Sequence, residues 1–495
     1  MSEVAPVGAR ELRRQMRSWR RDRADTTLFE QLSEAYIWVF STIVIGAMAI
    51  SAMIQTRVSV ASECTTATCG DARTSLVWAA AAGIVAVALA AAGAIGPIMV
   101  TPATGAWLLT TPIDRRPLLR SRLALACLAS AFACGVVVAT TALLAGFDDH
   151  AIAVLSALGT IAGACAAAGA AAWQSLGGRP TRVVALSLGG LVWVWTLLIA
   201  LDLAPGTTSG WIDGPVGWAL LAGAGVAMIA LIVRAASRLS ALLRAQLVPG
   251  GSLLSSLSGA LAGLDLTLAY DVLVARRWRT AATVRSVRGG PGGLWALAWR
   301  DVVRLRRSIG AVTALATALV VPYLVVALGL DAAVIPITAF TAFVSGLWLF
   351  SALRTTGRNP GLVRCFPMSL SAVRSATLIV PGSVLAVWSL AAAPAIRHGL
   401  DRTAPGDVVL VALATGMAGL VAIARWLLAP PPDYSQPLVS SPAGGVPVGL
   451  LLSTLRGFDV LALTVIPLLA SPDALGALIS LGLGGAALSI LVTRR

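Results

Sequence analysis

The stretch Leu76–Val100, LVWAAAAGIVAVALAAAGAIGPIMV, runs for 25 residues without a charged side chain. A helix needs about 20 consecutive apolar residues to cross the ~30 Å hydrocarbon core of a bilayer, so this stretch is long enough to span it. Similar stretches recur along the chain, whose 495 residues are 57% hydrophobic and 12% charged, with a mean hydropathy of +0.85. Soluble domains carry about 25% charged residues, so the composition excludes a soluble multidomain enzyme.

The apolar stretches predict an all-α, polytopic membrane protein with about 12 spanning helices, which would use around half of the chain. The expected spans are Ile37–Ile54, Leu76–Val100, Leu123–Ala145, Ile152–Trp173, Val183–Leu203, Val216–Ile232, Ile309–Leu328, Ala333–Leu353, Ala376–Ala395, Val408–Leu428, Leu450–Leu469 and Leu475–Val492. The Pro-rich stretch from Ala429 to Pro447 could hide a broken or re-entrant helix.

All 37 basic residues are Arg, and the net charge is +15. Without Lys the chain cannot carry a conventional Walker A site, so we expect no ATPase activity, no catalytic residues and no cofactor in this chain. Most of the Arg residues fall in alternate loops, and the positive-inside rule places these loops and both termini in the cytoplasm. We expect no nucleic-acid partner, because no basic-aromatic groove or motif is present.

Two basic amphipathic stretches predict helices that lie in the membrane interface. Leu12, Met16 and Trp19 recur at helical spacing among Arg residues ahead of the first span, and Trp295 and Trp299 do so ahead of the seventh. Such helices turn their rings toward acyl chains and their Arg side chains toward phosphates. The alternative is an ordinary basic flank that is helical by chance.

A second matched feature lies between the second and third spans of each half. Residues 111–118 read TPIDRRPL and residues 366–373 read FPMSLSAV, so that each has a Pro followed two positions later by a residue that can cap a helix. We expect a short, capped cytoplasmic helix in each place, although a generic turn would start in the same way. The candidate residues are Pro112, Asp114, Arg115, Arg116, Arg120, Pro367, Ser369 and Arg374.

These repeats divide the chain into two transmembrane halves, residues 1–234 and 294–495, joined by a cytoplasmic linker, residues 235–293. Six spans per half, an amphipathic helix before the first, and a capped helix between the second and third together resemble the permeases of ABC type-2 exporters. The resemblance implies two six-helix permeases fused in one chain. It also implies connecting helices at Trp19 and Trp299, and coupling helices at Pro112–Arg120 and Pro367–Arg374 that dock on the motor.

The resemblance implies function and partners as well. The chain would be a plasma-membrane permease that exports an amphiphilic or hydrophobic substrate, such as a lipid, peptide or antibiotic. Two separate ATP-binding cassette subunits would bind ATP and Mg, and membrane lipid would surround the chain. The outer loops are short, so the large extracellular domains of some exporters are absent, and the linker has no counterpart in the family.

Two other readings remain open. Asp114-Arg115-Arg116 faintly resembles the loop between spans two and three of major-facilitator proteins, which would make the chain a twelve-helix secondary transporter driven by an ion gradient. Against this, the flanking Gly spacing differs and no chain of buried acids is evident. The third reading is a membrane scaffold or sensor without cargo.

A few polar residues stand out within or between the spans. Arg425, Arg456 and Asp459 fall inside expected spans, where ionisable groups can mark a substrate path or, near an inner end, simply snorkel to the interface. Cys64 and Cys69 flank a short outer loop and could form a disulfide or remain free. We expect no metal site, because the chain has only two His residues, in separate loops.

Overall fold

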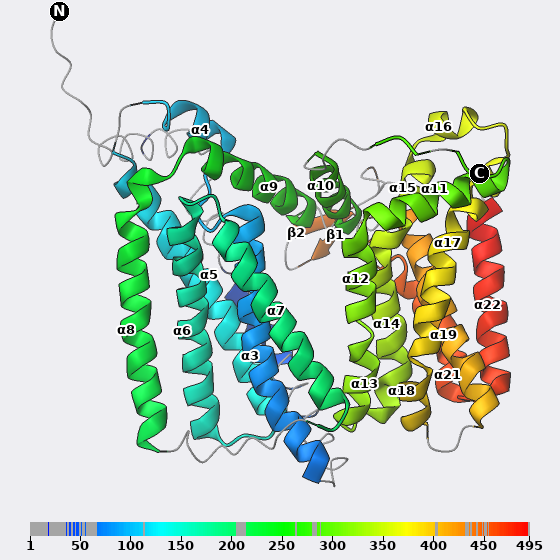
Figure 1. Cartoon of the computed structure of the whole chain (residues 1–495), viewed down its shortest axis with the longest axis horizontal. Helices are drawn as coiled ribbons and strands as arrows, with labels where there is room; N and C mark the ends of the chain where they lie inside the picture. The colour runs from blue at the N-terminus through cyan, green and yellow to red at the C-terminus, as the bar shows by residue number, and fades with distance from the viewer. Residues whose placement is uncertain are drawn as a thin grey trace, which may run out of the picture. The chain divides into compact units, whose positions relative to one another are not determined.

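The computed structural model describes residues 67–111, 114–203, 214–262, 265–279, 285–287, 289–400, 404–430, 438–441, 444–447 and 455–493, together with isolated positions among residues 18–55 and at 435, 449 and 453. Ten helices in these ranges are long and apolar enough to cross a membrane, which makes the chain a multi-pass membrane protein (Figure 1). The chain divides into two compact units. Unit 1 is Met1–Leu198, Ala204–Gly259 and Ser440–Gly444, and unit 2 is Ile199–Leu203, Ala260–Val439 and Gly445–Arg495.

Unit 1 contains five long apolar helices and three shorter helical elements. In chain order the elements are α3 (Ala67–Ile95), α4 (Pro102–Trp107), α5 (Arg115–Leu144), α6 (Asp149–Gln174), α7 (Arg179–Ala200), α8 (Pro215–Ser237), η1 (Leu239–Ala241) and α9 (Arg244–Ala262). Helix α6 is the most buried of the five and contacts α3, α5 and α8. Its small residues allow this close packing, since a Cβ at Gly159 would lie 2.8 Å from the Val138 side chain of α5.

Unit 2 begins with two helices that the sequence places outside the membrane and continues with five candidate spans. In chain order the helical elements are α10 (Leu266–Arg279), α11 (Leu294–Arg307), α12 (Ile309–Thr317), α13 (Val320–Ala327), η2 (Asp331–Ala333), α14 (Val334–Gly346), η3 (Leu347–Phe350), α15 (Ser351–Arg358), α16 (Pro360–Arg364), α17 (Leu370–Ala391), α18 (Ala393–His398), α19 (Pro405–Leu427), α21 (Phe458–Ala470) and α22 (Ala474–Thr493). The strands β1 (Leu438–Ser441) and β2 (Gly444–Pro447) lie between α19 and α21 in the chain, and their residues 440, 441 and 444 count with unit 1.

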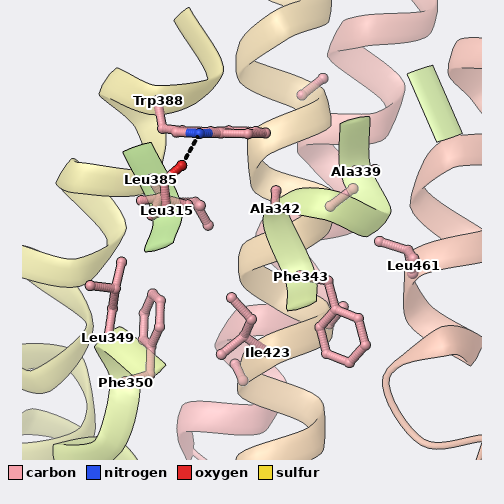
Figure 2. Close-up of a cluster of buried hydrophobic side chains, with 14 of the residues drawn as sticks. Leu315, Ala339, Ala342, Phe343, Leu349, Phe350, Leu385, Trp388, Ile423 and Leu461 are labelled. Atoms are coloured by element: carbon pink, nitrogen blue, oxygen red, sulfur yellow. Dashed lines mark hydrogen bonds between the residues drawn. The ribbon is translucent and has the colours of Figure 1, made fainter. Parts of the chain in front are cut away.

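The core of unit 2 surrounds α19, the most buried candidate span, which contacts α14, α17, α21 and α22. Figure 2 shows Ile423 of α19 flanked in this view by Phe350 and Phe343, all members of one buried apolar cluster. The indole Nε1 of Trp388 donates a hydrogen bond to the Leu315 carbonyl oxygen at 2.7 Å. The fourth apolar segment of each half, α6 in unit 1 and α19 in unit 2, is therefore the central helix of its unit.

Ten of the expected spans correspond to these ten candidate membrane helices. The eighth is interrupted, because α14 passes through the 3₁₀ segment η3 into α15. The first part of the eleventh, Leu450–Leu469, lies largely outside the described residues; its second part is α21 (Phe458–Ala470), whose 13 residues are fewer than a spanning helix needs on their own. The first, Ile37–Ile54, lies largely outside the described residues, so a total of twelve stays a prediction.

The stretch after α19 contains a short β-hairpin, β1 and β2, in place of a broken or re-entrant helix at residues 438–447. Within the stretch 235–293, predicted to be a linker, the helices divide between the units: α9 belongs almost entirely to unit 1 and α10 to unit 2. The sequence could not show this, because the division falls at Ala260, within a continuous helical pattern.

Candidate functional site

The predicted coupling residues lie at the start of long helices. Asp114 caps α5, where its Oδ1 accepts a hydrogen bond from the Arg116 amide at 3.0 Å, and Ser369 caps α17, where its Oγ accepts one from the Ala372 amide at 3.2 Å. The capping prediction is thus confirmed, but the prediction of a separate short helix at these residues is wrong. Both helices continue unbroken from the cap, for 30 and 22 residues. Pro112 lies outside the described residues.

A separate short helix does precede each cap. Helix α4 begins at Pro102 after the cap residue Thr101, and α16 begins at Pro360 after Asn359. We call residues 96–114 the unit 1 connector and residues 347–369 the unit 2 connector; each precedes the third predicted span of its half. The signal that could have located these helices is Pro in the first turn directly after a Thr or Asn cap position.

Arg residues near the start of α5 and α17 bond to a later segment of their own unit, at η1 in unit 1 and at the end of α22 in unit 2. Arg115 donates from Nη1 to the Leu242 carbonyl oxygen at 3.2 Å, just beyond η1, and Arg116 donates to Ser240 Oγ at 3.3 Å. Arg374 donates from Nη1 to the carbonyl oxygens of Leu491 and Val492, both at 3.2 Å, at the end of α22. These side chains are structural ties, whereas Arg120 is exposed.

Helix α9 packs tightly on the unit 1 connector. A Cβ at Gly250 would overlap the Ile95 carbonyl oxygen, and one at Gly251 would overlap that of Val100. The buried Gln174 side chain at the end of α6 joins the same place: its Oε1 accepts from the Ile98 amide at 3.2 Å and its Nε2 donates to the Ile98 carbonyl oxygen at 2.9 Å. The backbone that leads into α4 is therefore fixed on two sides.

Helix α10 holds the unit 2 connector through a buried ion pair. The guanidinium of Arg354 on α15, only 5% exposed, donates to both carboxylate oxygens of Asp271 at 3.0 and 2.8 Å. Its Nη1 also donates to the Leu427 carbonyl oxygen at the end of α19, at 3.0 Å. Tyr270 donates from its hydroxyl to the Leu347 carbonyl oxygen at 3.2 Å, and burial raises the pKa of Tyr270 to about 12.

Helix α11 holds the same connector through Arg304. This side chain pairs with Asp301 at 3.0 Å and also donates to Ser351 Oγ and to the Leu349 carbonyl oxygen. Asp301 is 3% exposed, and burial raises the pKa of its carboxyl to about 6 against the opposing effect of Arg304. Side chains of α10 and α11 thus donate hydrogen bonds to the Leu347 and Leu349 carbonyl oxygens of η3, the more tightly wound 3₁₀ segment between α14 and α15.

The remaining predicted site residues form a small group beside α19. Arg425 pairs with Asp459 at 3.3 Å, and Arg456 donates to the Pro430 carbonyl oxygen at 2.6 Å. Asp459 also accepts from the Gly457 amide at 2.7 Å, at the start of α21. Among the described residues these contacts support the structural reading of all three.

The other candidates divide between described and undescribed residues. Trp295 and Trp299 lie exposed on α11, as the amphipathic pattern predicts, whereas Leu12, Met16 and Trp19 lie outside the described residues. Cys69 is disulfide-bonded, and its predicted partner Cys64 also lies outside them. Across the described ranges no group of three or more His, Cys, Asp or Glu residues could hold a metal ion.

These features define a polytopic membrane protein with two helical units. In each unit, other helices hold the connector that precedes the third predicted span through hydrogen bonds and close packing. The chain belongs to a family of unknown function, DUF6297, whose profile matches residues 69–437. The match extends from α3 through α19 and so includes helices of both units. No curated protein shows significant similarity to the chain.

Proposed function

We propose that this chain is the transmembrane permease subunit of an ABC exporter. It would move an amphiphilic or hydrophobic substrate across the plasma membrane with energy from ATP that separate subunits hydrolyse. The observation that carries the proposal is the pair of short helices α4 and α16, each of which starts at Pro and stands in the connector of its unit. They replace Pro112–Arg120 and Pro367–Arg374 as the proposed coupling elements.

The rigidity of the connectors supports this role. A surface that passes a movement of the ATPase to the membrane helices must move together with those helices. Hydrogen bonds of Ile98 with Gln174 join the unit 1 connector to α6, and the hydrogen bond from Arg354 to the Leu427 carbonyl joins the unit 2 connector to α19. In each unit the short helix lies at the end of the bundle where the next long helix, α5 or α17, begins (Figure 1). The Arg-rich loops predict that this end is cytoplasmic.

The exposed surface of α4 supports docking of a protein. Trp107 is 79% exposed at the end of α4, while Gly105 on the opposite side packs against Val248 of α9. Large exposed aromatic residues on a fixed support are typical anchors at protein interfaces. In α16, Leu362 is exposed in the same way. ATP-driven closure of two motor subunits would then change the populations of inward and outward states through these contacts.

Affinity purification of the tagged full chain from its native membranes tests the proposal. We expect an ATPase with Walker motifs to co-purify, and we expect the double variant Trp107→Ala, Leu362→Ala to lose it. The matched control Leu201→Ala, Val216→Ala removes exposed apolar side chains at other chain positions and should retain it. Transport that persists without ATP but stops when the proton gradient collapses would favour a secondary transporter instead.

A further inference from the structure

The amphipathic helix α11 has a buried side and an exposed basic side. Ala298, Asp301 and Leu305 are buried at spacings of three and four, so they share one face that packs into unit 2. The Arg304 side chain points toward this unit, where it donates hydrogen bonds to Asp301 and to Ser351 of the unit 2 connector. The expectation that all Arg side chains of this helix face phosphates is therefore wrong for Arg304.

Three other Arg side chains of α11 point outward: Arg300, Arg306 and Arg307 are exposed. Arg307 donates to the carbonyl oxygen of Arg285, which fixes a fourth exposed Arg beside the end of the helix. In the part of the chain that the structure describes, no ion pair joins any of the four to a carboxylate. We call these four residues the α11 basic patch.

The α11 basic patch lies where the chain enters the membrane. The apolar helix α12 starts at Ile309, two residues after Arg307, and Ile309 is 66% exposed, which is suited to lipid contact. Trp295 is 62% exposed and Trp299 lies near it, one turn along α11. Trp rings prefer the level of the lipid headgroups, so the patch and the two rings match the boundary between hydrocarbon and phosphate.

We infer that the α11 basic patch binds anionic phospholipid headgroups in preference to zwitterionic ones. Four guanidinium groups that pair with no carboxylate among the described residues complement a phosphodiester that carries net negative charge, and guanidinium groups can bind phosphate oxygens with two hydrogen bonds. Each Arg near an anionic membrane surface contributes about 1 kcal/mol, which corresponds to about a fivefold preference. An acidic protein or nucleic acid would satisfy the charges but would leave Ile309 and Trp295 unexplained. This inference does not depend on the proposed transport function.

Retention of lipid by the purified full chain tests the inference. The protein is incubated in detergent with equimolar dioleoyl phosphatidylglycerol and dioleoyl phosphatidylcholine, separated from free lipid, and its bound lipid is quantified by mass spectrometry. Three variants are compared with the wild type: R300Q/R306Q/R307Q, the charge-preserving R300K/R306K/R307K, and R120Q/R122Q/R179Q. The last removes three exposed Arg residues at the Arg-rich end of unit 1 and changes the net charge equally.

We expect the wild type to enrich phosphatidylglycerol, and we expect the Gln variant of the patch to reduce the enrichment at least about fivefold. The unit 1 variant and the Lys variant should stay within about twofold of the wild type, and the Lys variant shows whether the substituted helix still folds. The inference is overturned if the wild type retains both lipids in the input ratio, or if the two Gln variants lose enrichment equally. The single variant R306Q should give an enrichment of phosphatidylglycerol between those of the wild type and the triple Gln variant, because each Arg of the α11 basic patch contributes to binding.

Discussion

Arg354 and Asp271 form an ion pair with two hydrogen bonds, at 3.0 and 2.8 Å, between α15 and α10. The pair joins a helix from the stretch expected to be a linker to the connector ahead of α17, and through the Leu427 carbonyl it reaches the central helix α19. In unit 1 the connector is held by the contact of α9 with residues 95–101, although α9 follows the spans of its unit whereas α10 precedes the spans of unit 2. The ion pair in unit 2 and the close backbone packing in unit 1 are different contacts, but each of them attaches the connector to the other helices of its unit.

Loss of the Arg354 guanidinium should destabilise unit 2 strongly. Arg354→Ala removes the buried partner of the pair and leaves the Leu427 carbonyl without its donor, while Asp271, 34% exposed, keeps Arg358 at 3.5 Å; we expect the free energy of unfolding to fall by about 2–3 kcal/mol. Thermal unfolding of the purified chain measures this. Arg425→Ala breaks the more exposed pair with Asp459, whose side chains are 28% and 43% exposed, and should cost no more than about 1 kcal/mol. Equal losses would contradict the role of Arg354.

Two glycines of α9 form a matched pair for testing the contact with the unit 1 connector. Gly251→Ala places a methyl group against the Val100 carbonyl and should displace α9, which also loses the hydrogen bond from the Val100 amide to the Leu247 carbonyl. Gly259→Ala meets nothing within 4 Å and should stabilise the helix by about 0.5–1 kcal/mol. Limited proteolysis between α8 and α10 should accelerate in the first variant only. Similar rates in both would show that α9 is not held there.

Asp301 should make stability depend on pH. Burial raises the pKa of its carboxyl from 3.8 to about 6, so between these values the folded chain keeps a proton that the unfolded chain releases. Its contribution is therefore fully present below about pH 4, falls as pH rises, and is lost above about pH 6, by about 3 kcal/mol in total. Asp301→Asn should flatten this part of the profile, as measured by unfolding between pH 4 and 7.

The control for this profile is an exposed carboxylate, Asp149, at the start of α6. Asp149→Asn should leave the wild-type dependence between pH 4 and 7 in place. If Asp301→Asn also leaves it in place, the buried carboxyl is ionised in the folded chain throughout this range, and the Arg304 pair outweighs the cost of its burial.

How far the sequence predicts this structure depends on the signal involved. Long apolar runs predict the ten candidate membrane helices well, because span length is set by the bilayer and not by distant contacts. The cap residues Asp114 and Ser369 are also predictable, because capping is local. The start of α21 at Phe458 is not, since it depends on a turn at residues 455–457 in which Gly457 has a positive φ of 92° and Arg456 is bonded to the distant Pro430 carbonyl.

The candidate site was harder to predict. The division of residues 235–293 between the units depends on contacts such as Arg354 with Asp271, 83 residues apart, and Gly251 with Val100. No local pattern encodes such a pair. Thr101-Pro102 and Asn359-Pro360 are local signals for the starts of α4 and α16, but Pro112 and Pro367, each followed two positions later by a cap residue, predict a helix start more strongly.

The central claim, that α4 docks a separate ATPase, is tested most directly by a photo-crosslinking residue at position 107 in native membranes. We predict an ATP-dependent crosslink between this position and an ATP-binding cassette subunit. We predict none from position 216, which lies at the start of α8, the opposite end of that helix from Arg234. A position 107 that crosslinks only to lipid, with or without ATP, would contradict it.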